Sequence, residues 1–480
     1  MPLPGATLPC CERQRGYDLL QPRSRISPGG LATHRRTKPN PSMLEEIRQA
    51  AARQRTARAT RRMKLASKRL LSEKGELGGM ALASELIERL QDLPDDALEG
   101  YFDYLASELS PDPQTVLRLA QAYADAPGAA TLLALTNAAE PARQELFRRL
   151  NRMPGGTAAV LHLRRALLAR LAGRPHLQAI ESDLLHLLNS WFNPGFLQMK
   201  RVDWNAPAQL LERIIHHEAV HAVDGWDDLR RRLQPDRRCF AFFHPQLRDE
   251  PLIFVEVALL AEMPAAIAPL IDKLSTPLPA ERFREAAFYS ISNCEPGLRG
   301  VSLGNFLIKT VAQQLQRELP RLRRFCTLSP IPGFANWLLS EPDFALLPQL
   351  PNLRRAGLAE LTAARERLRL LCGGDLGALQ GAAIHATMDD THTAALCQLA
   401  SAYLLLLSPT PAGDPVARFH LDNGARLERL NPRGNLSAKG LRQSFGMMVN
   451  YVYDLDKVEA RHAEFRLGEV ARSRGVGHPG

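Results

Sequence analysis

The stretch AAFYSISNCEPGLRGVSLGNFLIKTVAQQLQRELPRLRRFCTLS, residues 286–329, decides the fold class. Residues 286–292 are rich in apolar and aromatic side chains and predict a β-strand. Residues 297–305 are punctuated by glycine, and residues 308–319 repeat apolar side chains at helical spacing until Pro320. Residues 325–329 predict a second strand. This order of elements predicts a βαβ unit whose loop presents backbone N–H groups to an anion.

Two further strands are predicted upstream, at residues 239–243 and 252–257, joined by a polar link. Residues 80–190 contain five amphipathic segments separated by Asp, Pro and Gly, which predicts a helical bundle. These segments are residues 81–90, 96–109, 113–126, 142–153 and 157–173. The predicted fold class is α+β, with an N-terminal all-α helical bundle followed by a mixed α/β domain.

The charge of the chain is concentrated at one end. The 480 residues include 61 Lys+Arg and 51 Asp+Glu, a net charge of +10. Residues 1–75 carry a net charge of +12 and residues 76–480 a net charge of −2. A nearly neutral body argues against a nucleic-acid binder that uses its whole surface. We therefore divide the chain into a basic, largely disordered extension, a helical bundle, a C-terminal domain and a disordered tail, at residues 1–75, 76–190, 191–470 and 471–480.

Cysteine use and hydropathy indicate the compartment. The seven cysteines are scattered and include no CxxC pair, which is typical of reduced thiols in an intracellular protein. No run of about 18 apolar residues predicts a membrane span, and the first residues lack the apolar core of a secretory signal. We expect a cytoplasmic protein without a membrane or nucleic-acid partner. The basic, helix-prone residues 43–71 predict a solvated helix, with a mitochondrial address or a nucleic-acid arm as alternatives.

The segment His217-Glu218-Ala219-Val220-His221 is a literal HExxH motif. On a helix the two histidines would share a face and could bind zinc, with Glu218 as general base. A zinc site also needs a third protein ligand, and no such ligand is evident downstream. Because chance matches to so short a pattern are common, we favour a structural role and predict no metal site.

The glycine-rich loop and a strand end supply a second candidate site. Gly300 and Gly304 permit close approach of the backbone to a ligand, and Arg299 offers a charge to a phosphate, although the loop fits neither GxGxxG nor GxxxxGK[ST]. Ser329 is followed by the rigid turn of residues 330–333, so it is presented at the end of a strand. A tight turn and a strand cap are the structural alternatives.

A lone histidine, His420, lies downstream before the turn-forming pair Asn423-Gly424. If this segment is a strand, His420 and Asp422 point to the same face. Taken alone, a histidine here is more often structural than catalytic.

These segments together resemble the malonyl-CoA decarboxylase family, and LSPIPGF and FHLDNGA are the most specific of them. The resemblance covers roughly residues 184–456 in the family's order. It implies a helical domain followed by a catalytic acyl-CoA-binding domain that is similar to the acyl-CoA N-acetyltransferase fold, in a homotetramer. The matching segments are EAVHAVDGWDDLRRRL, RRCFAFFHP, EPLIFVEVAL, AFYSIS, GLRGVSLGNFLIK, QRELP, LSPIPGF and the tract from FHLDNGA to MMVNYVY.

The resemblance also implies the reaction and the residues that carry it. Malonyl-CoA would be converted to acetyl-CoA and CO₂, with His420 as the proton donor, Ser329 positioning and polarising the malonyl group, and Tyr453 close to the site. Ser302 stands where we expect Glu in animal members, so any role of that acid cannot be carried over. The malonyl-CoA-binding residues implied are Arg299, Gly300, Val301, Ser302, Leu303, Gly304, Asn305, Ser329 and His420.

The chemistry of decarboxylation sets its own requirements. Loss of CO₂ from malonyl-CoA leaves a thioester enolate, so the enzyme must stabilise the charge on oxygen and then protonate carbon. The thioester itself activates the substrate, so we expect no cofactor, neither biotin nor a metal. The alternatives are an acyl-CoA N-acyltransferase on the same fold, an HExxH zinc peptidase and a non-enzymatic basic scaffold.

Overall fold

The computed structural model describes residues 41–247, 249–301, 303–347 and 355–476. The chain divides into two compact units, Met1–Arg55 and Thr56–Gly480. The first described helix, α1 (Pro41–Ser72), confirms the helix predicted for residues 43–71. Its C-terminal half is not a solvated extension, because Met63 and Leu70 are buried in a hydrophobic core. The disorder predicted for residues 1–40 and 477–480 lies outside the described residues.

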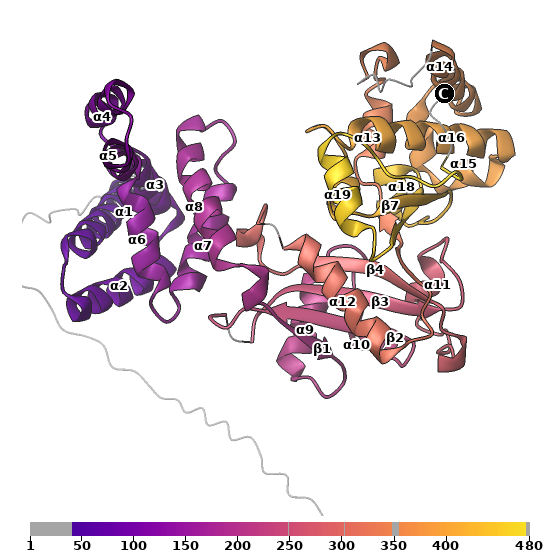
Figure 1. Cartoon of the computed structure of the whole chain (residues 1–480), viewed down its shortest axis with the longest axis horizontal. Coiled ribbons are helices and arrows are strands. Elements are labelled where there is room, and N and C mark those ends of the chain that lie inside the picture. The colour runs from indigo at the N-terminus through magenta and orange to yellow at the C-terminus, as the bar shows by residue number, and fades with distance from the viewer. Residues whose placement is uncertain (1–40, 248, 302, 348–354, 477–480) are drawn as a thin grey trace, which may run out of the picture. The chain divides into compact units, whose positions relative to one another are not determined.

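Residues 76–191 fold as helices, which confirms the predicted bundle, and each helix except those at residues 113–125 and 129–139 buries side chains (Figure 1). Their shared core contains Leu86, Phe102, Phe147 and Leu163, as expected for apolar residues at three- and four-residue spacing. The sequence did not predict α5 and α8. The helices are α2 (Glu76–Gln91), α3 (Asp95–Ser107), α4 (Pro113–Asp125), α5 (Ala129–Ala139), α6 (Ala142–Asn151), α7 (Gly156–Leu168) and α8 (Gln178–Trp191).

A mixed sheet forms the framework of the rest of the chain. Its strand order is β1-β2-β3-β4-β5-β8-β6, and β7 also pairs with β8. Strands β4 and β5 pair in parallel, and α12 (Gly304–Glu318) connects them, which confirms the predicted βαβ unit. The strands are β1 (Gln198–Val202), β2 (Arg237–Phe243), β3 (Pro251–Leu260), β4 (Glu285–Asn293), β5 (Arg324–Thr327), β6 (Ser329–Pro330), β7 (Arg426–Asn431) and β8 (Met448–Tyr453).

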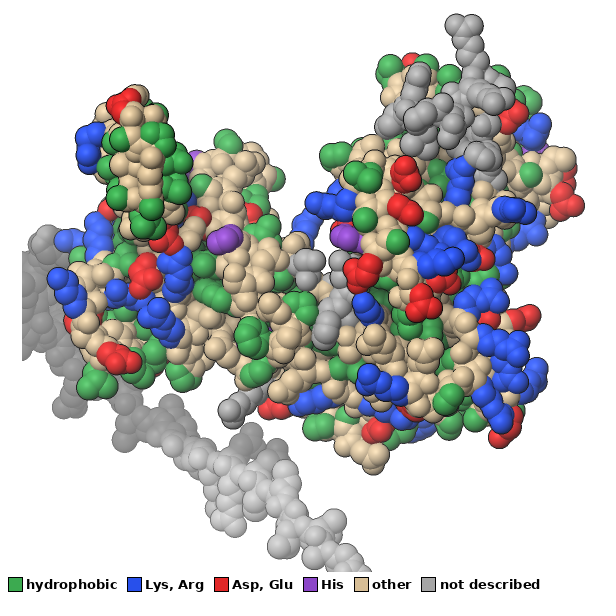
Figure 2. Space-filling model, in the orientation of Figure 1, with side chains coloured by type: hydrophobic (Ala, Val, Ile, Leu, Met, Phe, Trp, Pro, Cys, Tyr) green, Lys and Arg blue, Asp and Glu red, His purple; other side chains and the backbone are tan. Residues whose placement is uncertain are grey.

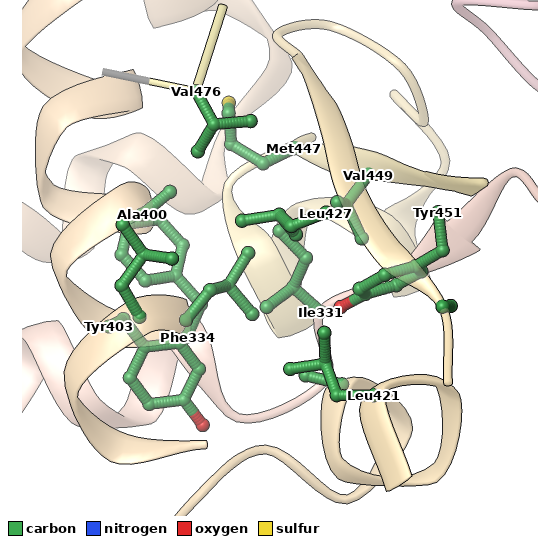
Figure 3. Close-up of a cluster of buried hydrophobic side chains, with 14 of the residues drawn as sticks. Ile331, Phe334, Ala400, Tyr403, Leu421, Leu427, Met447, Val449, Tyr451 and Val476 are labelled. Atoms are coloured by element: carbon green, nitrogen blue, oxygen red, sulfur yellow. The ribbon is translucent and has the colours of Figure 1, made fainter. Parts of the chain in front are cut away.

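Short helices surround this sheet, and many of them contribute to one large core. Figure 3 shows Ile331, from the turn after β6, and Phe334, the first residue of the helix that follows, in the same apolar cluster as Leu421 and Tyr451. Burial of each such side chain contributes about 1.5–3 kcal/mol, so this core fixes the turn against its neighbours. The helices are α9 (Ala208–His217), α10 (Gly225–Arg232), α11 (Ala268–Ile271), α13 (Phe334–Leu339), α14 (Arg355–Leu371), α15 (Ala382–Thr387), α16 (Asp390–Ala402), α17 (Pro415–Asp422), α18 (Ala438–Ser444) and α19 (Val458–Arg466).

The layout of helical region followed by mixed α/β region agrees with the predicted α+β class. The disordered tail predicted from residue 471 differs from the structure at residues 471–476. Val476 is buried in the large core, and Arg472 forms a parallel β-bridge with Leu427. The five cysteines within the described residues are free thiols. In the same residues, no helix is long and apolar enough to cross a membrane.

Candidate active site

Ser329 lies where the central strands change partners. Strand β5 pairs with β4 as far as Thr327, and after one residue the chain continues as β6, which pairs with β8 through Ser329 and Val449. Pro330 cannot extend a regular ladder because it lacks an N–H group. The strand therefore ends here, with Ser329 only 5% exposed.

His420 lies in the last turn of α17, a helix that begins with an Asp cap. Asp414 accepts hydrogen bonds from the backbone N–H groups of Val416 and Ala417, at 2.9 and 3.1 Å. The segment is thus a helix and not a strand, so the condition under which His420 and Asp422 would share a face is not met. Two residues on a helix are about 200° apart, and Asp422 faces His462 instead.

Four polar side chains form a hydrogen-bonded row around the imidazole. His420 Nε2 lies 3.0 Å from Ser329 Oγ, and His420 Nδ1 lies 2.8 Å from the Tyr453 hydroxyl. Ser329 in turn donates to Thr327 Oγ1 at 2.9 Å. Since the single Ser329 proton goes to Thr327, the imidazole must donate through Nε2–H and accept at Nδ1 from Tyr453. The row runs from Tyr453 to His420, then to Ser329 and Thr327.

Burial keeps this row uncharged. His420 is 4% exposed, and its burial lowers the pKa of the imidazole to about 3. Burial also raises the pKa of the Tyr453 hydroxyl well above its usual value. Both effects follow because a low-dielectric interior disfavours the charged form. At neutral pH the site therefore holds a neutral imidazole between two neutral hydroxyl groups.

Strand β8 fixes the orientation of the imidazole ring. Tyr451 and Tyr453 are two residues apart on the strand and so lie on the same face. The Tyr451 ring stacks on His420 with 4.7 Å between centroids and 28° between planes. The Tyr453 ring meets His420 edge-on at 6.1 Å. One strand therefore supplies both the stacking ring and the hydroxyl that bonds Nδ1.

A buried carboxylate ties the turn after Ser329 to the helix that carries His420. Asp414 caps α17 with one oxygen and accepts from the Gly333 N–H group with the other, at 2.9 Å. Only glycine fits at position 333, because a Cβ atom there would lie 2.1 Å from the Tyr403 hydroxyl oxygen. This contact holds the two halves of the site at a fixed separation.

The row borders a cavity of about 350 Å³. Ser329 and His420 line it, and so do Gly300, Val301 and Leu303 from the glycine-rich loop. Among the described residues that line this cavity, none is Asp, Glu, Lys or Arg. The cavity is therefore an apolar pocket in which two neutral polar groups converge, a common character of small-molecule sites.

The loop of the predicted βαβ unit reaches this cavity only in part. Gly300 adopts a positive φ of 82°, and Val301 and Leu303 follow it into the lining. Arg299 lines a neighbouring cavity instead. Gly304 and Asn305 begin α12, but their surroundings lie outside what the structure describes, as does the whole of Ser302.

Two family models match consecutive parts of the chain. The model of the malonyl-CoA decarboxylase N-terminal domain matches residues 109–192, and that of the C-terminal domain matches residues 195–478. The chain belongs to the malonyl-CoA decarboxylase family.

Several malonyl-CoA decarboxylases from other organisms are similar over most of the chain. The mitochondrial enzyme of Mus musculus is 35% identical over 79% of this chain and 78% of its own length. That of Anser anser anser is 36% identical over 68% of this chain and 66% of its own length.

Two solved structures are similar as well. The malonyl-CoA decarboxylase of Rhodopseudomonas palustris is 45% identical, with a TM-score of 0.75, over 87% of this chain and 98% of its own. The Agrobacterium vitis structure is 42% identical, with a TM-score of 0.72, over 86% and 98%. The malonyl-CoA decarboxylases are carboxy-lyases, which confirms the prediction of an enzyme.

The HExxH segment in this family member does not have the geometry of a zincin helix. Helix α9 ends at His217, so His217 and His221 do not share a helix face. Glu218 accepts hydrogen bonds from the N–H groups of Val220 and His221, both at 2.8 Å, and from the hydroxyl of Ser290. Within the described ranges, no three His, Cys, Asp or Glu side chains are arranged to hold a metal ion.

Sequence reasoning missed three residues that shape the site. Thr327 accepts from Ser329, Tyr451 stacks on His420, and Asp414 joins the two halves. Thr327 stood two residues before Ser329, the spacing that puts side chains on one face of a strand, so this signal was available. Tyr451 and Asp414 are distant in sequence from the residues that they position, and no local pattern marks them.

Proposed function

We propose that the chain decarboxylates malonyl-CoA in the cavity bordered by Ser329 and His420, giving acetyl-CoA and CO₂. The observation that carries the proposal is the 3.0 Å contact between Ser329 Oγ and His420 Nε2 at the wall of a cavity lined by no charged side chain among the described residues. Family membership supports the substrate and the product.

An apolar cavity suits the step in which the C–C bond breaks. A carboxylate that enters it loses its water and gains no counter-charge, whereas the departing CO₂ is neutral and loses little. The electron pair of the broken bond moves onto the thioester carbonyl and forms an enolate. Ser329 turns its hydroxyl proton from Thr327 to this oxygen and stabilises the charge that develops there.

His420 then supplies the proton that completes the product. Its Nε2–H group donates to the enolate carbon, which is a strong enough base to take a proton from neutral imidazole. The hydrogen bond from Tyr453 to Nδ1 stabilises the ring after it has given up this proton. Solvent restores the proton, so each turnover consumes one proton overall. None of these proposed steps uses a cofactor.

Acetyl-CoA formation by three proteins tests this proposal. The wild type should form acetyl-CoA and CO₂ from malonyl-CoA alone, and Ser329→Ala and His420→Ala should each lower kcat by about 100-fold or more. If both variants fold and match the wild type, the residue assignment is wrong. If the wild type leaves malonyl-CoA intact without an amine acceptor, the acyltransferase alternative gains support.

We also propose that the catalytic region has the acyl-CoA N-acetyltransferase fold. In support, the parallel pairing of β4 with β5 ends at Phe288 and Thr327, and the cavity follows between residues 289–293 and 328–330. Superposition on a solved acyl-CoA N-acetyltransferase tests this. The proposal is supported if two parallel strands superpose on β4 and β5 and stop pairing at the same point. A different strand order contradicts it.

A homotetramer is the oligomer that we propose. Helices α4 and α5 contain no buried residue, and Leu117, Leu132 and Leu133 are 66%, 45% and 61% exposed. An apolar hairpin of this kind is typical of a protein interface. Light scattering should give about four chains per particle for the wild type and fewer for Leu117→Glu/Leu133→Glu. A monomeric wild type would contradict the proposal.

The predicted domain limits and the cytoplasmic location stay predictions. The relatives from Mus musculus and Anser anser anser are mitochondrial enzymes by name, which supports the alternative of a mitochondrial address in the basic N-terminal residues. Fusing residues 1–75 to a fluorescent protein tests this directly. Import into mitochondria would contradict the cytoplasmic prediction.

A further inference from the structure

A second cavity of about 590 Å³ adjoins the catalytic one. Gly300, Pro415 and Phe419 line both cavities, so the two share a wall. Arg299, Arg418 and Arg466 also line the second cavity. The catalytic cavity and a basic chamber therefore lie on the two sides of the same three residues.

The three arginines come from three separate elements. Arg299 lies in the glycine-rich loop, Arg418 lies on α17 and Arg466 is the last residue of α19. None of their guanidinium groups forms an ion pair or hydrogen bond with another described residue. Three unpaired guanidinium groups around one chamber supply the positive charge and the N–H donors that an anionic ligand needs. Figure 2 shows basic side chains at the surface over α19.

The charges of the chamber are unbalanced even when its acidic side chain is counted. Asp422 also lines it, and its carboxylate lies 3.4 Å from His462 Nδ1. Three guanidinium groups thus face one carboxylate. A guanidinium group can pair with a phosphate or a carboxylate through two parallel hydrogen bonds. The excess of positive charge around this chamber suits a multiply charged anion such as a phosphate better than a single carboxylate.

We propose that Arg418 and Arg466 bind the ribose 3′-phosphate of coenzyme A, while Arg299 faces its pyrophosphate. This inference rests on the proposed function, because it takes the acyl end of the same molecule to lie in the catalytic cavity. Coenzyme A carries its phosphates at the end opposite the thioester. Two adjoining chambers, one apolar with the neutral Ser329–His420 pair and one basic, match these two ends.

Because the two chambers hold different parts of the substrate, we expect substitutions in the basic chamber to affect KM and not kcat. Arg418 precedes His420 by two residues on α17, so it lies about 200° around the helix, exposed where His420 is buried. Loss of its charge therefore weakens binding of the nucleotide without altering the reacting atoms. We expect a raised KM and an unchanged kcat.

The test compares malonyl-CoA with malonyl-3′-dephospho-CoA in three proteins. For the wild type, removal of the 3′-phosphate should raise KM about 10-fold or more. For Arg418→Gln/Arg466→Gln, KM for malonyl-CoA should rise to the same level, and removal of the phosphate should have no further effect. The matched control is Arg367→Gln, an exposed arginine of α14 outside both cavities, which should behave as the wild type.

Calorimetric titration with CoA and 3′-dephospho-CoA gives the same comparison without turnover. Preference for CoA in the wild type, lost in the double variant, supports the site even if no acetyl-CoA is ever formed, in which case only the proposed reaction fails. A double variant that retains the wild-type preference in both assays overturns the site.

Discussion

Two buried histidines, His420 and His221, are similar in exposure and in pKa but differ in their neighbours. They are 4% and 7% exposed, and burial is the main cause that lowers the pKa of each to about 3. His420 has a hydroxyl group at each ring nitrogen and borders a cavity. His221 bonds the backbone of Tyr289, and its Nε2 atom meets no partner among the described residues.

The surroundings of His221 are ionic where those of His420 are neutral. Beside it, Arg232 binds Asp228 and Glu256 at 2.9 and 3.0 Å in the interior. The charge of Arg232 helps to lower the pKa of His221. Burial therefore sets the protonation state of both histidines, whereas the groups at the ring nitrogens decide which chemical role each histidine can have. We interpret the ionic cluster as structural, and the neutral row is the one that we propose to move a proton.

The largest expected effect is in the ionic cluster. Arg232→Met leaves two buried carboxylates without their cation, which should lower the free energy of unfolding by about 3–5 kcal/mol. Urea denaturation measures this. The matched control is Arg230→Met, because Arg230 pairs with Asp227 while 62% exposed and should change stability by less than about 1 kcal/mol. Equal effects would show that the cluster is not the structural element we describe.

The second prediction sets the two histidines against each other. His420→Ala should lower kcat for acetyl-CoA formation by about 100-fold or more, whereas His221→Ala should change it by less than about 3-fold. The reason is that, of these two histidines, only His420 lines the cavity. Circular dichroism must show that both variants fold. If His221→Ala lost as much kcat as His420→Ala, the claim that only His420 acts in the reaction would be wrong.

The third prediction concerns pH and applies to both histidines. A histidine with a pKa of about 3 in the folded state and about 6.5 in the unfolded state binds more protons when unfolded, so stability falls as pH drops below 6.5. Between pH 6.5 and 5.0 each should contribute about 2 kcal/mol to this fall. The decline, measured in urea at both pH values, should be smaller by that amount in His420→Gln and in His221→Gln. An unchanged decline would mean that the imidazole is charged in the folded protein.

The smallest expected effect tests the tyrosine pair of β8. Tyr453→Phe removes the hydroxyl that His420 Nδ1 accepts from and should lower kcat about 10-fold with little change in KM. Tyr451→Phe is its control, because the Tyr451 hydroxyl has no partner among the described residues and its ring still stacks. A kcat that falls equally in both variants would make the rings, and not the hydroxyl of Tyr453, the important feature.

Much of the fold was predictable because its signals are local. The helices of residues 80–190 follow from apolar spacing, and β2 to β5 with α12 follow from short apolar runs and the glycine loop. The helix α17 was not predicted: its Asp cap, Asp414, lies six residues before His420, and the segment was interpreted from a two-residue alternation alone. The HExxH segment shows the reverse case. Its local pattern would suit one helix that carries both histidines, but the helix ends at His217.

The sequence by itself determined the α+β class, the strand end at Ser329 and, through the motifs around Ser329 and His420, the family. Only the tertiary structure decided that these two residues, 91 positions apart, share a hydrogen bond, and that Tyr453 completes it. The physical reason is that strand and helix periodicities act over a few residues. The pairing of β8 with both β5 and β6, by contrast, depends on a core built from the whole C-terminal half of the chain.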